Sequence, residues 1–206
     1  MLHPCGAVIY YWSMLENEVL KAIRERRSVL RFTDAAVSDD QVEAVLEAGR
    51  WAPSYINAQP WEFIVVRDAR LRARVADILR RVTIAWQGFS QAPILIVVAV
   101  DAAMDPRHHL EGGAAAVQNM AIMAHSIGLG SFWAGILEQA DSPGSAEDDL
   151  RTLLGIPKRR RLIAVLPLGV PAYTPQGNRK PLSEIVHRDR FEHRPAARQV
   201  STRKAG

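Results

Sequence analysis

Cysteine is almost absent from this sequence. Its 206 residues include one cysteine, Cys5, so no disulfide bond can form within the chain. No group of cysteine and histidine residues has the spacing of a zinc site. Such sparing use of cysteine is typical of reducing compartments, and we expect a cytoplasmic protein. Any redox chemistry would therefore depend on a bound cofactor.

Long hydrophobic runs are also absent. The longest apolar run, residues 93–100, is much shorter than the roughly 20 residues that cross a bilayer as a helix. The apolar residues 7–12 follow no lysine or arginine and precede no small-residue cleavage site, as an export signal would require. We therefore expect neither a membrane protein nor a signal peptide.

Charge of one sign is only in modest excess. There are 26 Lys and Arg against 22 Asp and Glu, which gives a formal net charge of +4. The excess lies in residues 158–161 and in the arginine-rich segment after His187. Apart from Phe191, no phenylalanine, tyrosine or tryptophan interleaves with either run, whereas aromatic residues recur in proteins that bind single-stranded nucleic acid. We expect a solvated strand flank and a chain end, with no nucleic-acid partner. An anionic cofactor suits the charge equally well.

The remaining composition is that of an ordinary globular protein. Apolar residues make up 48% of the chain and charged residues 23%, and no repeat or low-complexity stretch interrupts them. Residues 1–13 do not share the pattern of the later residues, and Met14 is a candidate start because acids come after it in a first helical turn. We expect an N-terminal extension over 1–13, one domain over 14–191 and a basic tail over 192–206.

Helical and strand patterns alternate irregularly along this domain. Ser38 and Gln41 form a capping box that predicts a helix ending near Arg50. Apolar spacing predicts four more helices, beginning at Leu15 and spanning 69–87, 110–127 and 146–154. Apolar runs predict buried strands over 61–66, 93–100 and 162–168. The irregular alternation indicates a single domain of the α+β class.

The first candidate binding residues are Arg26, Arg27 and Ser28, where the first predicted helix ends. Two planar guanidinium groups and a hydroxyl supply the charge-assisted donors that a phosphate dianion requires. Arginine pairs at helix ends are also common as solvated partners of the helix dipole. Taken alone, the cluster is better explained as a solvated helix end than as a phosphate site.

The second candidate is the loop over residues 52–61, which is fixed by Pro53 and Pro60. It carries the carboxamides of Asn57 and Gln59, each of which can donate and accept hydrogen bonds. A flavin presents a matching edge, in which one N–H donor stands between two carbonyl acceptors. The alternative is a turn in which the polar side chains bond their own loop.

Taken in order, these segments resemble the nitroreductase family of FMN enzymes. No single segment is specific for this family, but the order and spacing of the segments over residues 14–191 make the resemblance specific. The segments that carry the resemblance are residues 26–32 (RRSVLRF), 52–61 (APSYINAQPW), 112–120 (GGAAAVQNM), 128–135 (GLGSFWAG), 168–171 (LGVP) and 179–182 (RKPL).

The resemblance implies a fold and a set of site residues. The fold is a central mixed β-sheet flanked by helices, in an intertwined homodimer whose two sites are shared between subunits. Arg26, Arg27 and Ser28 would hold the FMN phosphate and ribityl chain, and Arg179 and Lys180 would close on the phosphate. The residues expected along the flavin ring are Pro53, Ser54, Asn57, Gln59, Trp133, Ala134 and Gly135.

The resemblance also implies a reaction. NADH or NADPH would deliver hydride to flavin N5, and a planar, electron-poor acceptor such as a nitroaromatic or a quinone would then take the electrons. No catalytic side chain and no metal are expected, because the flavin carries the chemistry. Alternatives are reductive dehalogenation or metabolite dehydrogenation on the same fold, or a flavin-binding protein without turnover.

One position departs from the family pattern. Members commonly carry a basic residue two places after the serine, directed at flavin N1 and O2, and here that place is Leu30. Arg31 is not an obvious substitute, because successive side chains of an extended segment face opposite ways. A cation near N1 favours the reduced, anionic flavin. We therefore hypothesise a lower flavin potential, or a basic group supplied from elsewhere.

Overall fold

The computed structural model describes residues 16–136 and 144–191 of the chain. The expected extension over 1–13 and the basic tail lie outside these residues. The chain divides at residue 175 into two compact units. The second unit contains the short helix α7 (Leu182–Ile185) and a stacked pair of rings, His187 and Phe191, with centroids 4.3 Å apart. The sheet and the other helices belong to the first unit.

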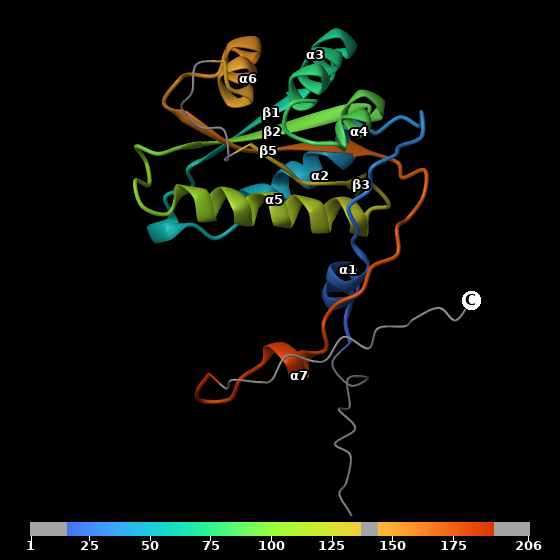
Figure 1. Cartoon of the computed structure of the whole chain (residues 1–206), viewed down its shortest axis with the longest axis vertical. Coiled ribbons are helices and arrows are strands. Elements are labelled where there is room, and N and C mark those ends of the chain that lie inside the picture. The colour runs from blue at the N-terminus through green and yellow to red at the C-terminus, as the bar shows by residue number, and fades with distance from the viewer. Residues whose placement is uncertain (1–15, 137–143, 192–206) are drawn as a thin grey trace, which may run out of the picture. The chain divides into compact units, whose positions relative to one another are not determined.

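A five-stranded sheet forms the centre of the first unit (Figure 1). Its strands are β1 (Trp61–Val66), β2 (Ile94–Asp101), β3 (Gly130–Ser131), β4 (Ala134–Gly135) and β5 (Arg160–Gly169). Their order is β1-β2-β5-β3, and β4 also pairs with β5. All strand pairings are antiparallel, and a single parallel bridge joins Ser28 to Ser131.

Helices cover both faces of the sheet. On one side lie α3 (Ala69–Leu79), α4 (Trp86–Gln91) and α6 (Ala146–Leu154); on the other lie α2 (Asp39–Arg50) and α5 (His109–Ser126), with α1 (Glu18–Glu25) against α5 (Figure 1). Strand β2 separates the two cores, because Leu95 and Val97 join the first and Ile96 and Val98 the second. The predicted α+β class is confirmed.

The capping box predicted for α2 is present. The Ser38 hydroxyl accepts from the Gln41 backbone N–H at 3.2 Å, and the Gln41 side chain accepts from the Ser38 N–H at 3.1 Å. The single helix predicted over 69–87 is wrong, because α3 ends at Leu79 and α4 begins at Trp86. Thr83 lies in the break, where its hydroxyl accepts from the Ala85 N–H at 3.1 Å. Such a local bond competes with helix continuation.

A buried arginine joins three strands at one end of the sheet. Arg160 donates two hydrogen bonds to the carboxylate of Glu62, at 2.6 and 2.7 Å, and a third to Asp101. A hydrogen bond from the Ala103 N–H, and then the charge of Arg160, lower the pKa of Asp101. The Asp101 N–H in turn donates to the carbonyl of Pro60 at 2.8 Å. This network therefore fixes the point at which the loop over residues 52–60 enters β1.

No helix in the two described ranges combines the length and the apolar character that crossing a membrane requires.

Candidate functional site

Arg26, Arg27 and Ser28 lie where the chain leaves α1 and joins the edge of the sheet. Arg26 ends the helix with extended backbone (φ −54°, ψ 130°), and Ser28 forms the parallel bridge to Ser131. The next residue, Val29, donates its backbone N–H to the carbonyl of Ser131 at 3.0 Å. These two backbone contacts hold the segment that carries the three predicted phosphate ligands against β3.

Gly130 makes this contact between distant segments possible. A Cβ atom at residue 130 would lie 2.8 Å from the Cβ of Val29 and within 2.9 Å of both of its methyl carbons. Carbon atoms normally approach to about 3.5–4.0 Å. Only glycine lets the segment after α1 lie this close to β3.

The arginine side chains differ in their surroundings. Arg27 is half-buried, and its Nη1 donates to the carbonyls of Arg24 at 2.5 Å and Arg26 at 2.9 Å. Its Nε is buried and has no hydrogen-bond partner among the described residues. Arg26 is also half-buried, and Ser28 is exposed. The Arg27 guanidinium therefore keeps an unused donor, and the next residue in the chain has an exposed hydroxyl.

Trp133, Ala134 and Gly135 come two to four residues after β3, and β4 pairs with β5 as β3 does. Ala134 is buried and pairs with Val165 of β5, whereas Trp133 is 43% exposed. Gly135 is exposed, and among the described residues, its chain neighbours aside, the Trp133 indole nitrogen is the atom that comes within 4 Å of its would-be Cβ, at 3.7 Å. The structure brings these predicted flavin contacts to the same sheet edge as Ser28.

The predicted loop over residues 52–60 bonds largely to itself. The hydroxyl of Ser54 accepts from the backbone N–H of Gln59 at 2.9 Å, and the Gln59 carboxamide donates to the carbonyl of Asn57 at 3.3 Å. This bond from the Gln59 carboxamide is of the kind that the turn alternative predicts. Asn57 and Pro53 are exposed, and the Asn57 carboxamide forms no side-chain hydrogen bond within the described ranges.

This loop also holds strained backbone. Ile56, Asn57 and Gln59 have φ angles of 45°, 59° and 50°, the left-handed region that a β-branched residue such as isoleucine rarely adopts. The Ile56 side chain is nonetheless 81% exposed, so burial of its own apolar surface does not compensate. Strain of this kind is typical of functional loops.

Helix α5 separates the two halves of the predicted site. The loop packs on its N-terminal end, where Ser54 and Pro60 lie 3.6 Å from the would-be Cβ of Gly112. The arginine cluster lies at its C-terminal end, where Glu25 of α1 is 3.9 Å from His125. Gly112 and His125 are thirteen residues apart, which is about 20 Å at 1.5 Å per residue. Within one chain the loop and the arginine cluster therefore do not meet.

Three other positions noted in the sequence are exposed. Arg179 and Lys180 belong to the second unit and are exposed, with Arg179 donating to the neighbouring carbonyl of Asn178 at 2.7 Å. Leu30 is 37% exposed, and the adjacent Arg31 is exposed as well. The side chain at residue 30 can therefore be changed without disturbing the core.

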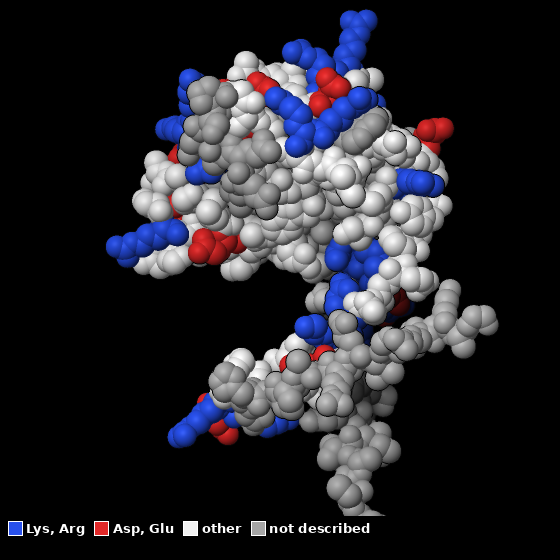
Figure 2. Space-filling model, viewed as in Figure 1, with Lys and Arg blue, Asp and Glu red and all other residues white. Residues whose placement is uncertain are grey.

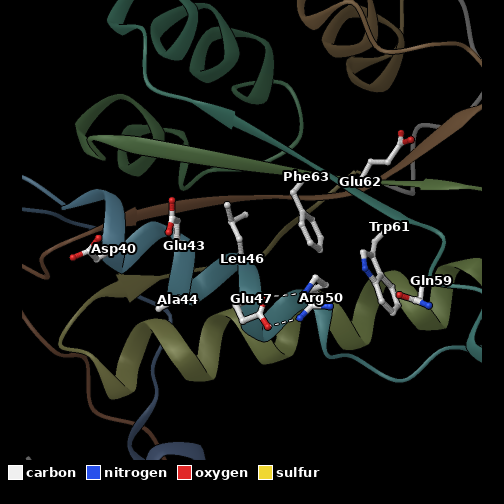
Figure 3. A pocket seen from close by; sticks show the side chains of 10 residues that line it. All are labelled: Asp40, Glu43, Ala44, Leu46, Glu47, Arg50, Gln59, Trp61, Glu62 and Phe63. Atoms are coloured by element: carbon white, nitrogen blue, oxygen red, sulfur yellow. Dashed lines mark hydrogen bonds and ion pairs between the residues drawn. The ribbon is translucent and has the colours of Figure 1, made fainter.

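A groove of about 1050 Å³ lies between α2 and β1 (Figure 3). Its charged lining is mostly acidic: Asp40, Glu43, Glu47 and Glu62. Its one cation, Arg50, is hydrogen-bonded to Glu47, and this bond lowers the pKa of Glu47 to about 2. A groove lined in this way does not suit a phosphate dianion.

Many arginines outside the candidate site are engaged in ion pairs. Over α3, Figure 2 shows blue and red side chains next to one another. Arg81 forms an ion pair with Asp149 of α6. In the basic run over 158–161, Arg160 is bound by Glu62 and Asp101, and Arg161 lies 3.3 Å from Glu147. These cations stabilise the fold.

Comparison with known proteins agrees with this geometry. Residues 23–170 match the Nitroreductase family. The chain is 31% identical over 160 residues to a proposed NADH dehydrogenase/NAD(P)H nitroreductase of Methanothermobacter thermautotrophicus, with 77% of this chain and 80% of that protein covered.

The chain belongs to the nitroreductase family.

Two further relatives of this nitroreductase-family chain are informative. A crystal structure of a proposed nitroreductase from Desulfovibrio desulfuricans in complex with FMN is 36% identical, with a TM-score of 0.70 over 86% of this chain and 99% of that one. The iodotyrosine deiodinase of Nematostella vectensis is more distant, at 25% identity over 199 residues, covering 82% of this chain and 74% of that protein.

The sequence did not reveal what Ser131 does for the site. Residues 128–135 stood out as a family segment, but nothing in them indicated that Ser131 would pair with Ser28, about a hundred residues earlier. The available signal was Gly130, since a glycine within a strand often marks close approach of another backbone. Another contact missed is the ring of Tyr55 against His108, with centroids 4.9 Å apart, which ties the loop to the start of α5.

Proposed function

We propose that this protein is an FMN-dependent oxidoreductase that takes electrons from NADH or NADPH and passes them to a planar, electron-poor acceptor such as a nitroaromatic or a quinone. The observation that carries the proposal is the pairing of Ser28 and Val29, next to Arg26 and Arg27 in the chain, with Ser131 of β3, at the sheet edge where β4 (Ala134–Gly135) also pairs with β5. The FMN complex of the Desulfovibrio desulfuricans relative supports the same cofactor.

The residues at this sheet edge fit a flavin phosphate. A phosphate dianion requires several donors that keep unused hydrogen-bonding capacity. The buried Nε of Arg27 has no partner in the described part of the chain, and the Ser28 hydroxyl is exposed. Both would serve as phosphate donors, and Gly135 would leave room above β4 for a flat ring.

Bound FMN would supply the redox chemistry by accepting two electrons from the nicotinamide and releasing them to the acceptor. The protein would bind and orient the ring and limit access to one face. Trp133, which is partly exposed beside Gly135, would form one wall of the site. The free carboxamide of Asn57 would bond the uracil-like edge of the ring.

The site is completed by a second copy of the chain. Asn57 lies at one end of α5 and the arginine cluster at the other, about 20 Å away along the helix. A two-fold dimer in which the α5 helices run antiparallel would bring the loop of each chain to the cluster of the other. Two equivalent sites would result, each built from both subunits.

Reductive dehalogenation is a second candidate reaction. It is favoured by the similarity to the iodotyrosine deiodinase of Nematostella vectensis. Both reactions would use the same cofactor, so the acceptor distinguishes them. Release of halide from a halogenated phenol by the reduced protein would favour dehalogenation, and loss of absorbance of a quinone or nitroaromatic would favour the first proposal.

Purification tests the proposal directly. We expect a yellow protein with one FMN per chain, identified by absorbance and mass, that bleaches anaerobically with NADH or NADPH and recovers its colour on addition of a quinone. A yellow protein that does not bleach would identify a flavin-binding protein without turnover. A colourless protein that does not take up FMN would contradict the proposed function altogether.

A further inference from the structure

His108 lies against the loop that would contact the flavin ring. Its imidazole packs on the ring of Tyr55, with centroids 4.9 Å apart, and Tyr55 is two positions before Asn57, the proposed partner of the uracil-like edge. The side chain of His108 is 46% exposed, so a second molecule can reach it. An acceptor stacked on a ring that Asn57 holds would lie near this imidazole.

The surrounding residues fix the position of His108. Its backbone N–H donates to Oδ1 of the buried Asp105 at 2.8 Å, and its carbonyl accepts from the Gly112 N–H at 3.0 Å. The ring nitrogen Nδ1 lies 3.4 Å from Oε1 of Glu111, in the first turn of α5. The other ring nitrogen, Nε2, forms no hydrogen bond within the described ranges. His108 is therefore held in place with one nitrogen open.

The other histidines of the described residues are placed differently. His109 is half-buried, and its Nδ1 lies 2.8 Å from the carbonyl oxygen of Asp105. His125 is in the last turn of α5, and His187 belongs to the second unit. Of the histidines in this part of the chain, His108 alone combines an open ring nitrogen with a position beside the loop.

The proposed reaction needs a proton that the cofactor does not supply. A hydride carries two electrons and one proton, so a quinone that receives a hydride becomes a hydroquinone monoanion. One more proton gives the neutral hydroquinone. Histidine is the side chain that changes its charge near neutral pH, so it can give up this proton and regain it from water.

We propose that His108 is a catalytic acid that gives this proton to the acceptor. Its Nε2–H bond breaks as the O–H bond of the hydroquinone forms, and solvent then protonates the neutral imidazole again. Two electrons pass from the nicotinamide to the acceptor, and no other oxidant or reductant takes part. This inference rests on the proposed function, because it assigns a proton donor to the acceptor of that reaction.

Glu111 is the positioning residue for this acid. Its carboxylate faces Nδ1, so it orients the imidazole and stabilises the protonated form. A hydrogen bond from its own backbone N–H, and then one from His108, lower the pKa of Glu111, which keeps the carboxylate charged at neutral pH. The other ionisable residues beside His108 in the loops are Tyr55, Asp105, Arg107 and His109.

An ordinary surface pair would show the same contact between His108 and Glu111. Exposed pairs of this kind contribute little to stability. A general loss of activity or stability in a variant would therefore not identify a catalytic acid. The distinguishing property is the need of the acceptor for a proton.

Acceptors that differ in this need test the proposal. The reduced holoprotein is mixed anaerobically with a quinone or with ferricyanide, which takes up one electron and no proton. For His108→Gln we expect the rate with the quinone to fall about 100-fold, and the rates with ferricyanide and of reduction by NADH to change less than about twofold. His109→Gln, which can keep a donor for the Asp105 carbonyl, is the matched control and should leave all three rates unchanged. An unchanged quinone rate in His108→Gln, or an equal fall with ferricyanide, would overturn the proposal.

A second variant keeps the imidazole and tests the role of Glu111. Glu111→Gln should lower the quinone rate about fivefold, because a charge next to the imidazolium is lost, and should not change the ferricyanide rate. Equal changes with both acceptors would identify an ordinary surface pair. In His108→Ala, added imidazole should restore the quinone rate and leave the ferricyanide rate as it is. Absence of this rescue would count against proton transfer by His108.

Ligand binding without turnover tests the position of His108. The phenol 2-naphthol, which the flavin does not reduce, can donate its O–H to Nε2 as a hydroquinone would. At pH 8 we expect its Kd for the oxidised holoprotein, measured from the flavin absorbance, to rise about fivefold in His108→Ala through loss of one hydrogen bond. A wild-type Kd would overturn the placing of His108 at the acceptor.

The failure of this inference and that of the proposed function are distinguishable. A yellow protein that bleaches with NADH or NADPH, and whose His108→Gln variant reduces the quinone at the wild-type rate, retains the proposed function and loses the catalytic acid. A protein that does not take up FMN, or does not bleach, loses both.

Discussion

Replacing Gly130 with alanine should loosen the arginine cluster from the sheet. The new Cβ would lie 2.8 Å from the Cβ of Val29 and 2.8–2.9 Å from its methyl carbons, about 1 Å inside normal contact. Val29 is only 4% exposed and is held by the hydrogen bond of its N–H to Ser131. The segment that carries Arg27 and Ser28 must therefore move away from β3.

The expected cost has two parts. Overpacking of this kind lowers the free energy of unfolding by about 1–3 kcal/mol. Displacement of the phosphate ligands should also weaken or break one charge-assisted hydrogen bond, worth about 1.5–3 kcal/mol, so the Kd for FMN should rise at least about tenfold. Urea unfolding of the flavin-free protein measures the first part, and quenching of FMN fluorescence on binding measures the second.

Two controls make this prediction specific. Gly112→Ala places its Cβ 3.6 Å from its nearest neighbours, an ordinary contact within a helix, and should leave stability unchanged or raise it by up to about 1 kcal/mol. Val29→Ala removes two of the three close carbons, so the double variant with Gly130→Ala should lose less than the sum of the single losses. A Gly130→Ala protein with wild-type stability and wild-type FMN affinity would refute the reasoning.

Three further predictions concern the redox end, the strained loop and the buried arginine. Leu30→Arg should raise the midpoint potential of the bound flavin by about 30 mV, because a cation near N1 favours the reduced form; an unchanged potential in spectroelectrochemical titration would count against this role for residue 30. Ile56→Asn should raise the free energy of unfolding by about 1 kcal/mol by relieving the left-handed backbone, whereas the control Ile84→Asn, at a wholly exposed residue without positive φ, should not. Arg160→Met removes the cation that is hydrogen-bonded to Asp101 and Glu62, while Arg159 remains 3.9 Å from Asp101, and should lower the free energy of unfolding measured in urea at pH 7. The folded-state pKa of Asp101 is lowered, so its carboxylate contributes stability above the unfolded-state pKa near 4, and this contribution is lost as the pH falls through the folded-state pKa. Between pH 7 and 3 the wild type should therefore lose more free energy of unfolding than Arg160→Met. Equal losses would contradict the pairing of Asp101 with Arg160.

Features set by nearby residues could be predicted from the sequence. The capping box of α2 joins residues three apart, and its two hydrogen bonds form as expected. The long strands β2 and β5 have apolar runs that belong to buried strands, and both were predicted within two residues of their ends. In each case the sequence pattern and the helix cap or strand that it predicts lie within the same short segment.

Features set by distant contacts could not be predicted. Strand β3 has two residues, too few to show a period, and pairs with Ser28 far away in the chain. The break between α3 and α4 depends on a hydroxyl bond at Thr83 within a segment of otherwise helical composition. The order of the family segments along the chain likewise gave no sign that Asn57 and Arg27 lie at opposite ends of α5.

Complementation between two damaged chains tests most directly whether each flavin site is built from both subunits. Arg27→Ala damages the phosphate half of a site and Asn57→Ala the ring half, so each homodimer carries one lesion in both of its sites. A mixed dimer of the two variants, isolated with two different tags, would have both lesions in one site and none in the other if the sites are shared. We predict that the mixed dimer binds one FMN with wild-type affinity, measured by isothermal titration calorimetry. A mixed dimer in which both sites bind FMN with reduced affinity would contradict the account, because each site would then carry one lesion and belong to a single chain.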